Sequence, residues 1–213
     1  ALASVHIGGP DNSASTEYYG SGNDDGFAEY GVASFTFTKD DFGLAPDETI
    51  QGINGMTLTL THNNRSFSDG SELQFWLTTD TFGGDFSALD YDADLINGLN
   101  ASEYTNAPVS LGIFPYSTQA SGTDDFVLEI ADLEDELIAV FEAGAEFNII
   151  LTAVTADADI TFSGLDNTFS PGDPSLAVDL VGAVDRNPPG ISSLSPEDDS
   201  TDVPINRGLS IRF

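Results

Sequence analysis

Residues 146–184 read EFNIILTAVTADADITFSGLDNTFSPGDPSLAVDLVGAV. Three runs of β-branched and aromatic residues are separated by short clusters of Asp, Gly, Asn and Pro, a pattern typical of consecutive antiparallel strands. Apolar residues alternate within each run, so each set lies on one face, against a core. These sets are Phe147, Ile149 and Leu151, then Ile160 and Phe162, then Leu176, Val178 and Leu180. DRNPPG follows at 185–190, where no regular element can continue.

The same alternation recurs upstream and predicts further strands. The clearest is Met56–His62, in which Met56, Leu58 and Leu60 point inward and the threonines between them point outward. Other predicted strands lie at 4–7, 32–38, 72–79, 109–116 and 126–130. Between them, the sequence predicts a polar loop over 8–26, an acidic connection over 39–49 and a long loop or short helical turn over 80–108.

One helix is predicted, from Leu133 to Ala143. Asp132 is its expected N-cap, and Gly144 stands where a left-handed C′ residue belongs. Eight or nine short strands and one short helix predict an all-β fold, an antiparallel β-sandwich of the jelly-roll type. We assign residues 1–184 to this sandwich, 185–190 to a linker, and 191–213 to the first strands of another domain or a connecting tail.

The charge balance of the chain indicates which kinds of molecule it is expected to bind. Five Lys and Arg stand against 36 Asp and Glu, a formal net charge of −31. Such a surface repels phosphates and anionic lipids, which argues against nucleic-acid binding and membrane insertion. Carboxylates in this number are favoured by high salt, which screens their repulsion, or by divalent cations bound between them. They also form a solvated surface that keeps an exported protein soluble.

A few sequence features indicate where in or outside the cell the protein works. There is no cysteine, so disulfides and thiolate metal sites are excluded. No apolar run is long enough for a transmembrane helix. Ala1-Leu2-Ala3 has the small-x-small form of a signal-peptidase site, which hints at export. We therefore expect a secreted protein, extracellular or at the cell surface.

Three segments carry a resemblance to a known family. They are ASFTFT followed by INGMTLTLTH, then LIAVFEAGAEFNIILTA, then TFSGLDNTFSPGDPSLAVDL. Their order over residues 4–184 resembles the secreted DNRLRE-type β-sandwich domains, which are similar in shape to carbohydrate-binding jelly rolls. The resemblance implies a bacterial, modular, secreted protein whose sandwich binds carbohydrate and carries a structural calcium.

The last part of the chain resembles a different domain. ISSLSPEDDSTDVPINRGLSIRF, residues 191–213, is similar to the opening of a bacterial Ig-like domain. Two strands cannot bury an apolar face, so we expect the natural protein to continue. The alternative is that residues 208–213 pair with a strand edge of this domain or of a neighbouring copy.

Acidic loops are the candidate metal sites. Asp90, Asp92 and Asp94 have the alternate spacing that can wrap Ca²⁺, but an EF-hand would need Gly and Glu where Leu95 and Ala101 stand. Asp24 and Asp25 form a comparable cluster. Both sets are predicted calcium ligands, and the alternative is a solvated acidic loop.

Trp76, the single tryptophan, is the candidate centre of a sugar-binding platform. Its place in the strand points it away from the core-facing Leu73, Phe75 and Leu77, beside the polar Gln74. Tyrosines in the loops can extend an apolar platform for a sugar ring, and we name Tyr18, Tyr19 and Tyr91. The alternative is that a long loop or the helix covers Trp76 as part of a second core.

Catalysis has no selective signal. The chain contains no Gly-x-Ser-x-Gly, no His-Glu-x-x-His and no phosphate-binding loop. We therefore predict a non-catalytic extracellular module of a larger secreted protein that binds polysaccharide with structural calcium. The alternative is a building block of a cell-surface layer or filament, which self-associates by strand addition through residues 208–213.

Overall fold

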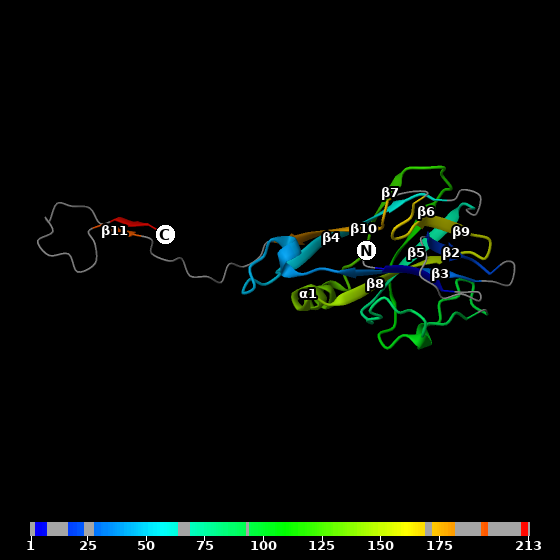
Figure 1. The fold of residues 1–213 in the computed structure, drawn as a ribbon, viewed down its shortest axis with the longest axis horizontal. Coiled ribbons are helices and arrows are strands. Elements are labelled where there is room, and N and C mark those ends of the chain that lie inside the picture. Colours follow the sequence, from blue (N-terminus) through cyan, green and yellow to red (C-terminus); the bar gives the residue numbers. More distant parts are fainter. Residues whose placement is uncertain are drawn as a thin grey trace, which may run out of the picture.

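The computed structural model describes residues 3–7, 17–23, 28–63, 69–92, 94–168, 172–181, 193–195 and 210–212. Most of the regular elements are strands (Figure 1). They are β1 (Ala3–Ile7), β2 (Glu17–Ser21), β3 (Tyr30–Thr36), β4 (Gly52–Thr61), β5 (Ser71–Thr78), β6 (Val109–Tyr116), β7 (Thr123–Val127), β8 (Glu146–Ala153), β9 (Asp159–Ser163), β10 (Ser175–Val181), β11 (Ser193–Ser195) and β12 (Ser210–Arg212). The helical elements are the 3₁₀ turns η1 (Lys39–Phe42) and η3 (Ala101–Glu103) and the helix α1 (Glu134–Ala143).

Two antiparallel sheets form a sandwich. The larger has the order β1-β3-β8-β5-β6 and the smaller the order β10-β4-β7. A separate ribbon pairs β2 with β9, and another pairs β11 with β12. Figure 1 shows β4 and β10 in one layer, β3 and β8 in the layer below them, and α1 beside the start of β8. The predicted antiparallel all-β sandwich with one short helix is confirmed.

The main core lies between the two sheets, where the predicted alternation places it. The inward residues of β4, β5, β8 and β9 all belong to one buried cluster. Their members are Met56, Leu58, Leu60, Leu73, Phe75, Leu77, Phe147, Ile149, Leu151, Ile160 and Phe162. A period of two along each strand is enough to form this core, because alternate side chains share one face.

A second core covers the opposite face of the larger sheet. Segment 80–108, predicted as a loop or a short helical turn, contributes Phe86, Leu89, Leu99 and Tyr104 to it. These side chains pack against Ile7, Tyr30, Val32 and Ile150 of the sheet. The larger sheet is thus buried on both faces, which explains why both sets of alternate residues on β8 are apolar or buried.

Strand β2 lies in a region predicted as a polar loop. Tyr18 and Gly20 are buried in it, and the strand pairs with β9 from Glu17 opposite Ser163 to Ser21 opposite Asp159. The five residues EYYGS hold one core side chain, which is too short a pattern to reveal a strand. The prediction was wrong because pairing with β9, rather than local propensity, stabilises this segment.

Helix α1 begins one residue later than predicted. Its N-cap is Leu133, which makes no side-chain capping bond, so the prediction of Asp132 as N-cap was wrong. Gly144 has φ 60° and ends the helix in the left-handed conformation, as predicted. Leu137, Val140 and Phe141 are buried and belong to the main core.

The predicted linker at 185–190 lies outside the described residues. Within the described part of the tail, β11 and β12 pair at three positions, from Ser193 opposite Arg212 to Ser195 opposite Ser210. No helix among the described residues is long and apolar enough to cross a membrane.

Candidate functional site

Trp76 lies where the alternation predicts, on the outer face of β5, but it is not an open platform. Its ring is half-buried and packs against the second core. The indole Nε1 donates a hydrogen bond of 2.9 Å to Thr152 Oγ1 on β8. This burial matches the alternative interpretation of Trp76, as part of a second core under a long loop. Gln74, on the same face, donates through Nε2 to Ser110 Oγ on β6 at 2.8 Å.

The predicted tyrosines do not gather around Trp76 as one surface. Tyr18 is fully buried in the main core and donates its hydroxyl to the Ile149 carbonyl at 2.9 Å, so its place in a binding platform was wrong. Burial raises the pKa of Tyr18 well above its ordinary value. Tyr19 is half-buried and donates to Asp159 Oδ1 at 3.2 Å. Tyr91 is half-buried against the second core, the cluster that Trp76 also contacts.

In the predicted calcium loop, the carboxylates of Asp90 and Asp92 accept hydrogen bonds from backbone N–H groups of the same loop. Asp90 Oδ1 accepts a hydrogen bond from Tyr91 N at 2.8 Å, and Asp92 Oδ1 accepts one from Asp94 N at 3.0 Å. Among the described residues, no group of three or more His, Cys, Asp or Glu side chains is placed to hold a metal ion. Asp24 and Asp25 lie outside the described residues. A structural calcium stays a prediction, which calorimetric titration with Ca²⁺ tests.

One polar groove lies where β5 continues into the loop that covers the second core. Its volume is about 380 Å³, and it is lined by Thr79, Asp80, Thr81, Phe82, Glu103, Thr105 and Asn106. Asp80 fixes one wall, because its carboxylate accepts hydrogen bonds from Thr105 N at 2.7 Å and Asn106 N at 2.8 Å. Asn148 of β8 donates to the Asp80 carbonyl at 2.6 Å and anchors the turn to the sheet.

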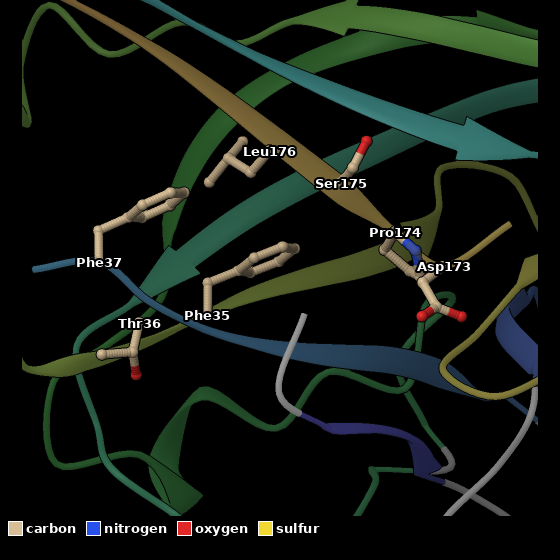
Figure 2. Close-up of a pocket in the computed structure, with 7 residues that line it drawn as sticks. All are labelled: Phe35, Thr36, Phe37, Asp173, Pro174, Ser175 and Leu176. Carbon is tan, nitrogen blue, oxygen red and sulfur yellow. The ribbon is translucent and has the colours of Figure 1, made fainter. Parts of the chain in front are cut away.

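A second, more apolar groove lies on one side of the sandwich, between β3 and β10. Its volume is about 360 Å³, and it is lined by Phe35, Thr36, Phe37, Asp173, Pro174, Ser175 and Leu176. Figure 2 shows the rings of Phe35 and Phe37 pointing from β3 toward Leu176, while Thr36 points away. Phe35 and Phe37 also stack on Phe147 of β8, with ring centroids 5.9 Å and 6.2 Å apart.

The two lateral edges of the sandwich, at β6–β7 and at β3–β10, differ in how the two sheets are joined there. On the β6–β7 side, the chain after β7 joins the sheets, because Glu129 N donates to the Leu111 carbonyl at 2.9 Å. On the β3–β10 side, β4 is the one described strand that pairs with β10. Pairing of β1 with β3 ends at Ser34, so within the described residues Phe35 and Thr36 pair only with β8. We call this β3–β10 side of the sandwich, together with its groove, the open side.

The open side is the candidate that the sequence did not reveal. The sequence predicts that Leu176, Val178 and Leu180 face the core, and they do, but they are only half-buried. Alternation shows which face of a strand is apolar. It does not show whether another strand pairs with the outer edge of β10, where the described part of the chain places none.

No protein-family model matches this chain, and a search of curated proteins finds no match. The resemblance to DNRLRE-type and carbohydrate-binding sandwiches, and that of residues 191–213 to an Ig-like domain, therefore stay predictions.

Proposed function

We propose that this chain is a non-catalytic building block of an extracellular or cell-surface assembly, and that copies associate through the open side of the sandwich. The observation that carries the proposal is an edge of β10 with which no described strand pairs, and beside which the inward residues of β10 remain half-buried. Such an edge presents a row of free N–H and C=O groups that another strand can pair with.

The polar side chains support a structural role. Many carboxylates hold the backbone in place: Glu134 Oε1 accepts from Ile53 N at 2.9 Å, Glu142 Oε1 from Ile50 N at 2.6 Å and Glu146 Oε1 from Phe82 N at 2.8 Å. His62 is buried, its Nε2 lies 2.9 Å from Asp124 Oδ2, and its ring contacts those of Tyr116 and Phe162. These groups are engaged in the fold, which favours a scaffold over an enzyme.

Light scattering of the whole chain over a wide range of concentrations tests this function. We expect the mean mass to rise with concentration, and to rise further with added salt, because salt screens the repulsion between copies that each carry a net charge of −31. A monomer at every concentration and salt level would refute the proposal.

The second candidate function is polysaccharide binding, within a jelly-roll-type module as the family resemblance implies. The groove at 79–106 favours it, because threonine hydroxyls, carboxylates and an amide surround one half-buried ring, Phe82. Sugar sites combine an apolar surface with a few placed polar groups. Retardation in gels that contain a neutral polysaccharide, lost on Glu103→Gln together with Thr81→Val, supports this candidate; equal mobility in every gel counts against it.

A further inference from the structure

The unpaired edge of β10 keeps the regular shape that strand addition requires. The register shift opposite Asp179 and Leu180 puts the extra residue, Asn54, on β4, so β10 itself alternates without interruption. Every second residue of an antiparallel strand directs its N–H and C=O away from its partner. These groups face the open side, directly beside the apolar groove.

The groove can receive apolar side chains. Phe35 and Phe37 form one wall and Leu176 the other, and Pro174 is buried at one end. A volume of about 360 Å³ lies near the lower limit of the roughly 300–1,000 Å³ usual for ligand sites. A strand with alternating apolar side chains can place one of them in this groove beside Leu176 and continue the half-buried apolar face of β10 with the others.

Residues 208–213 of the chain offer this pattern. In GLSIRF, Leu209, Ile211 and Phe213 alternate with Ser210 and Arg212. The surrounding stretch 203–213 contains two arginines and no acidic residue, in a chain with 36 Asp and Glu. Asp179 on β10 and Asp173 just before this strand are exposed, so the charges of donor and acceptor are complementary.

The donor is assigned to a second copy. Within one chain, β12 pairs with β11 rather than with β10. That pairing spans three residues on each strand, and an isolated two-stranded ribbon is marginally stable in water. If β12 leaves this three-residue ladder and pairs instead with the edge of a sandwich sheet, it gains a larger partner surface. This gain favours pairing between two copies of the chain.

We propose that residues 209–213 of one copy add antiparallel to β10 of another copy and extend its smaller sheet to four strands. Phe213 then lies opposite Leu176 and enters the groove, Ile211 lies opposite Val178, and Leu209 lies opposite Leu180. Arg212 lies on the outer face opposite Ala177, diagonal to Asp179. This inference rests on the proposed self-association and names the surface and the segment that perform it.

Disulfide trapping between two whole-chain variants tests the contact, because the native chain has no cysteine. Ala177→Cys and Arg212→Cys proteins are mixed and oxidised. Opposite residues on paired strands have the Cα separation that a disulfide needs. The control replaces Ala177→Cys with Val127→Cys, an exposed position on β7 at the other side of the sandwich. We expect the Ala177/Arg212 mixture to yield at least about ten times more linked heterodimer than the control, a preference of ~1.4 kcal/mol.

The outcomes separate the inference from the proposed function. If the native chain self-associates in light scattering but the mixture gives no more link than the control, copies associate through another surface and the inference is wrong. If the native chain stays monomeric and no link forms, both proposals fail. If a chain with both cysteines links only to itself while the mixture stays unlinked, the segment occupies its own β10, which overturns the assignment to a second copy.

Discussion

Tyr30 and Tyr104 illustrate how single residues hold the second core together. The Tyr104 hydroxyl donates to the Tyr30 hydroxyl at 3.3 Å, and the Tyr30 hydroxyl donates to the Asp90 carbonyl at 3.2 Å. Burial raises the pKa of Tyr30 to about 12 and raises the pKa of Tyr104 further. The loop over 80–108 is thus fastened to β3 by groups that must stay protonated.

Alkaline pH should therefore loosen the fold. The unfolded chain releases tyrosine protons near pH ~10, whereas the folded chain still holds them, so the free energy of unfolding falls as the pH rises from about 10 towards the raised values. Tyr104→Phe removes one such group. We expect it to cost about 1 kcal/mol at neutral pH, for the lost hydrogen bond, and to make the alkaline loss shallower. Urea unfolding at several pH values measures both; an unchanged slope above pH ~10 would contradict this account.

Gly31 tests the close contact between β3 and β2. A Cβ at this position would lie 2.7 Å from Tyr18 Cδ2 and 2.8 Å from the Tyr19 carbonyl oxygen. We expect Gly31→Ala to lower the free energy of unfolding by about 1–3 kcal/mol, the usual cost of overpacking. Gly55→Ala is the matched control, because no atom lies within 4 Å of its Cβ position. Equal stability of the two variants would show that β2 does not pack as described.

Among the elements, most strands and the face that each turns to the core could be predicted from the sequence. Which strands lie next to each other in the sheets could not. Alternation along β4, β5, β8 and β9 identifies the buried side chains correctly, because a pleated strand repeats every two residues. Strand β2 and the second core depend on contacts between distant segments, such as Tyr18 with Ile149 and Trp76 with Thr152. No local pattern encodes such pairings.

The same limit applies to the candidate site. Trp76 was placed on the correct face of β5, but the loop that covers this face has no periodicity to signal it. The open side follows from sheet order, which alternation does not determine. Of the residues predicted to bind a ligand, Tyr18 is a core residue because its strand pairs with β9.

One ion pair connects helix α1 to the loop before β4. Lys39, the single lysine, lies 2.7 Å from Glu142 Oε2 and also donates to the Glu48 carbonyl at 2.6 Å. Both side chains are less than one third exposed, at 19% and 25%. The pair therefore holds the start of the loop and the end of the helix together.

A double-mutant cycle measures this connection. We expect Lys39→Met to cost about 1–3 kcal/mol, because it removes hydrogen bonds from a charged donor. Glu142→Gln removes the negative charge that pairs with Lys39 but keeps a side-chain oxygen that can accept the hydrogen bond from Ile50 N. A coupling of at least about 0.5 kcal/mol between the two substitutions is expected. Additive effects would show that the loop and helix are held by packing alone.

At the scale of the whole molecule, repulsion among carboxylates is the dominant electrostatic effect. The formal charge is −31, and a chain with five Lys and Arg against 36 Asp and Glu can pair few of its carboxylates as Lys39 pairs with Glu142. Salt screens repulsion over distances beyond ~10 Å at 0.1 M. We expect the melting temperature to rise steadily with NaCl, as followed by circular dichroism. A fall in melting temperature would mean that attractive pairs outweigh the repulsion.

Among the described strands, the sandwich is closed on the β6–β7 side and open on the β3–β10 side, where we propose that copies associate. A lysine at position 177 opposes strand addition, because it would lie directly opposite Arg212 of the incoming strand, and like charges at opposite positions of paired strands are destabilising. Ala177 and Val127 both have exposed side chains, on the open and closed sides respectively. Lysine at either position should therefore leave the monomer folded.

Light scattering of the Ala177→Lys and Val127→Lys chains across a range of concentrations shows whether copies associate through the open side. We predict that Ala177→Lys remains monomeric at concentrations where the native chain and Val127→Lys associate. Association of Ala177→Lys to the same extent as the native chain would contradict the account.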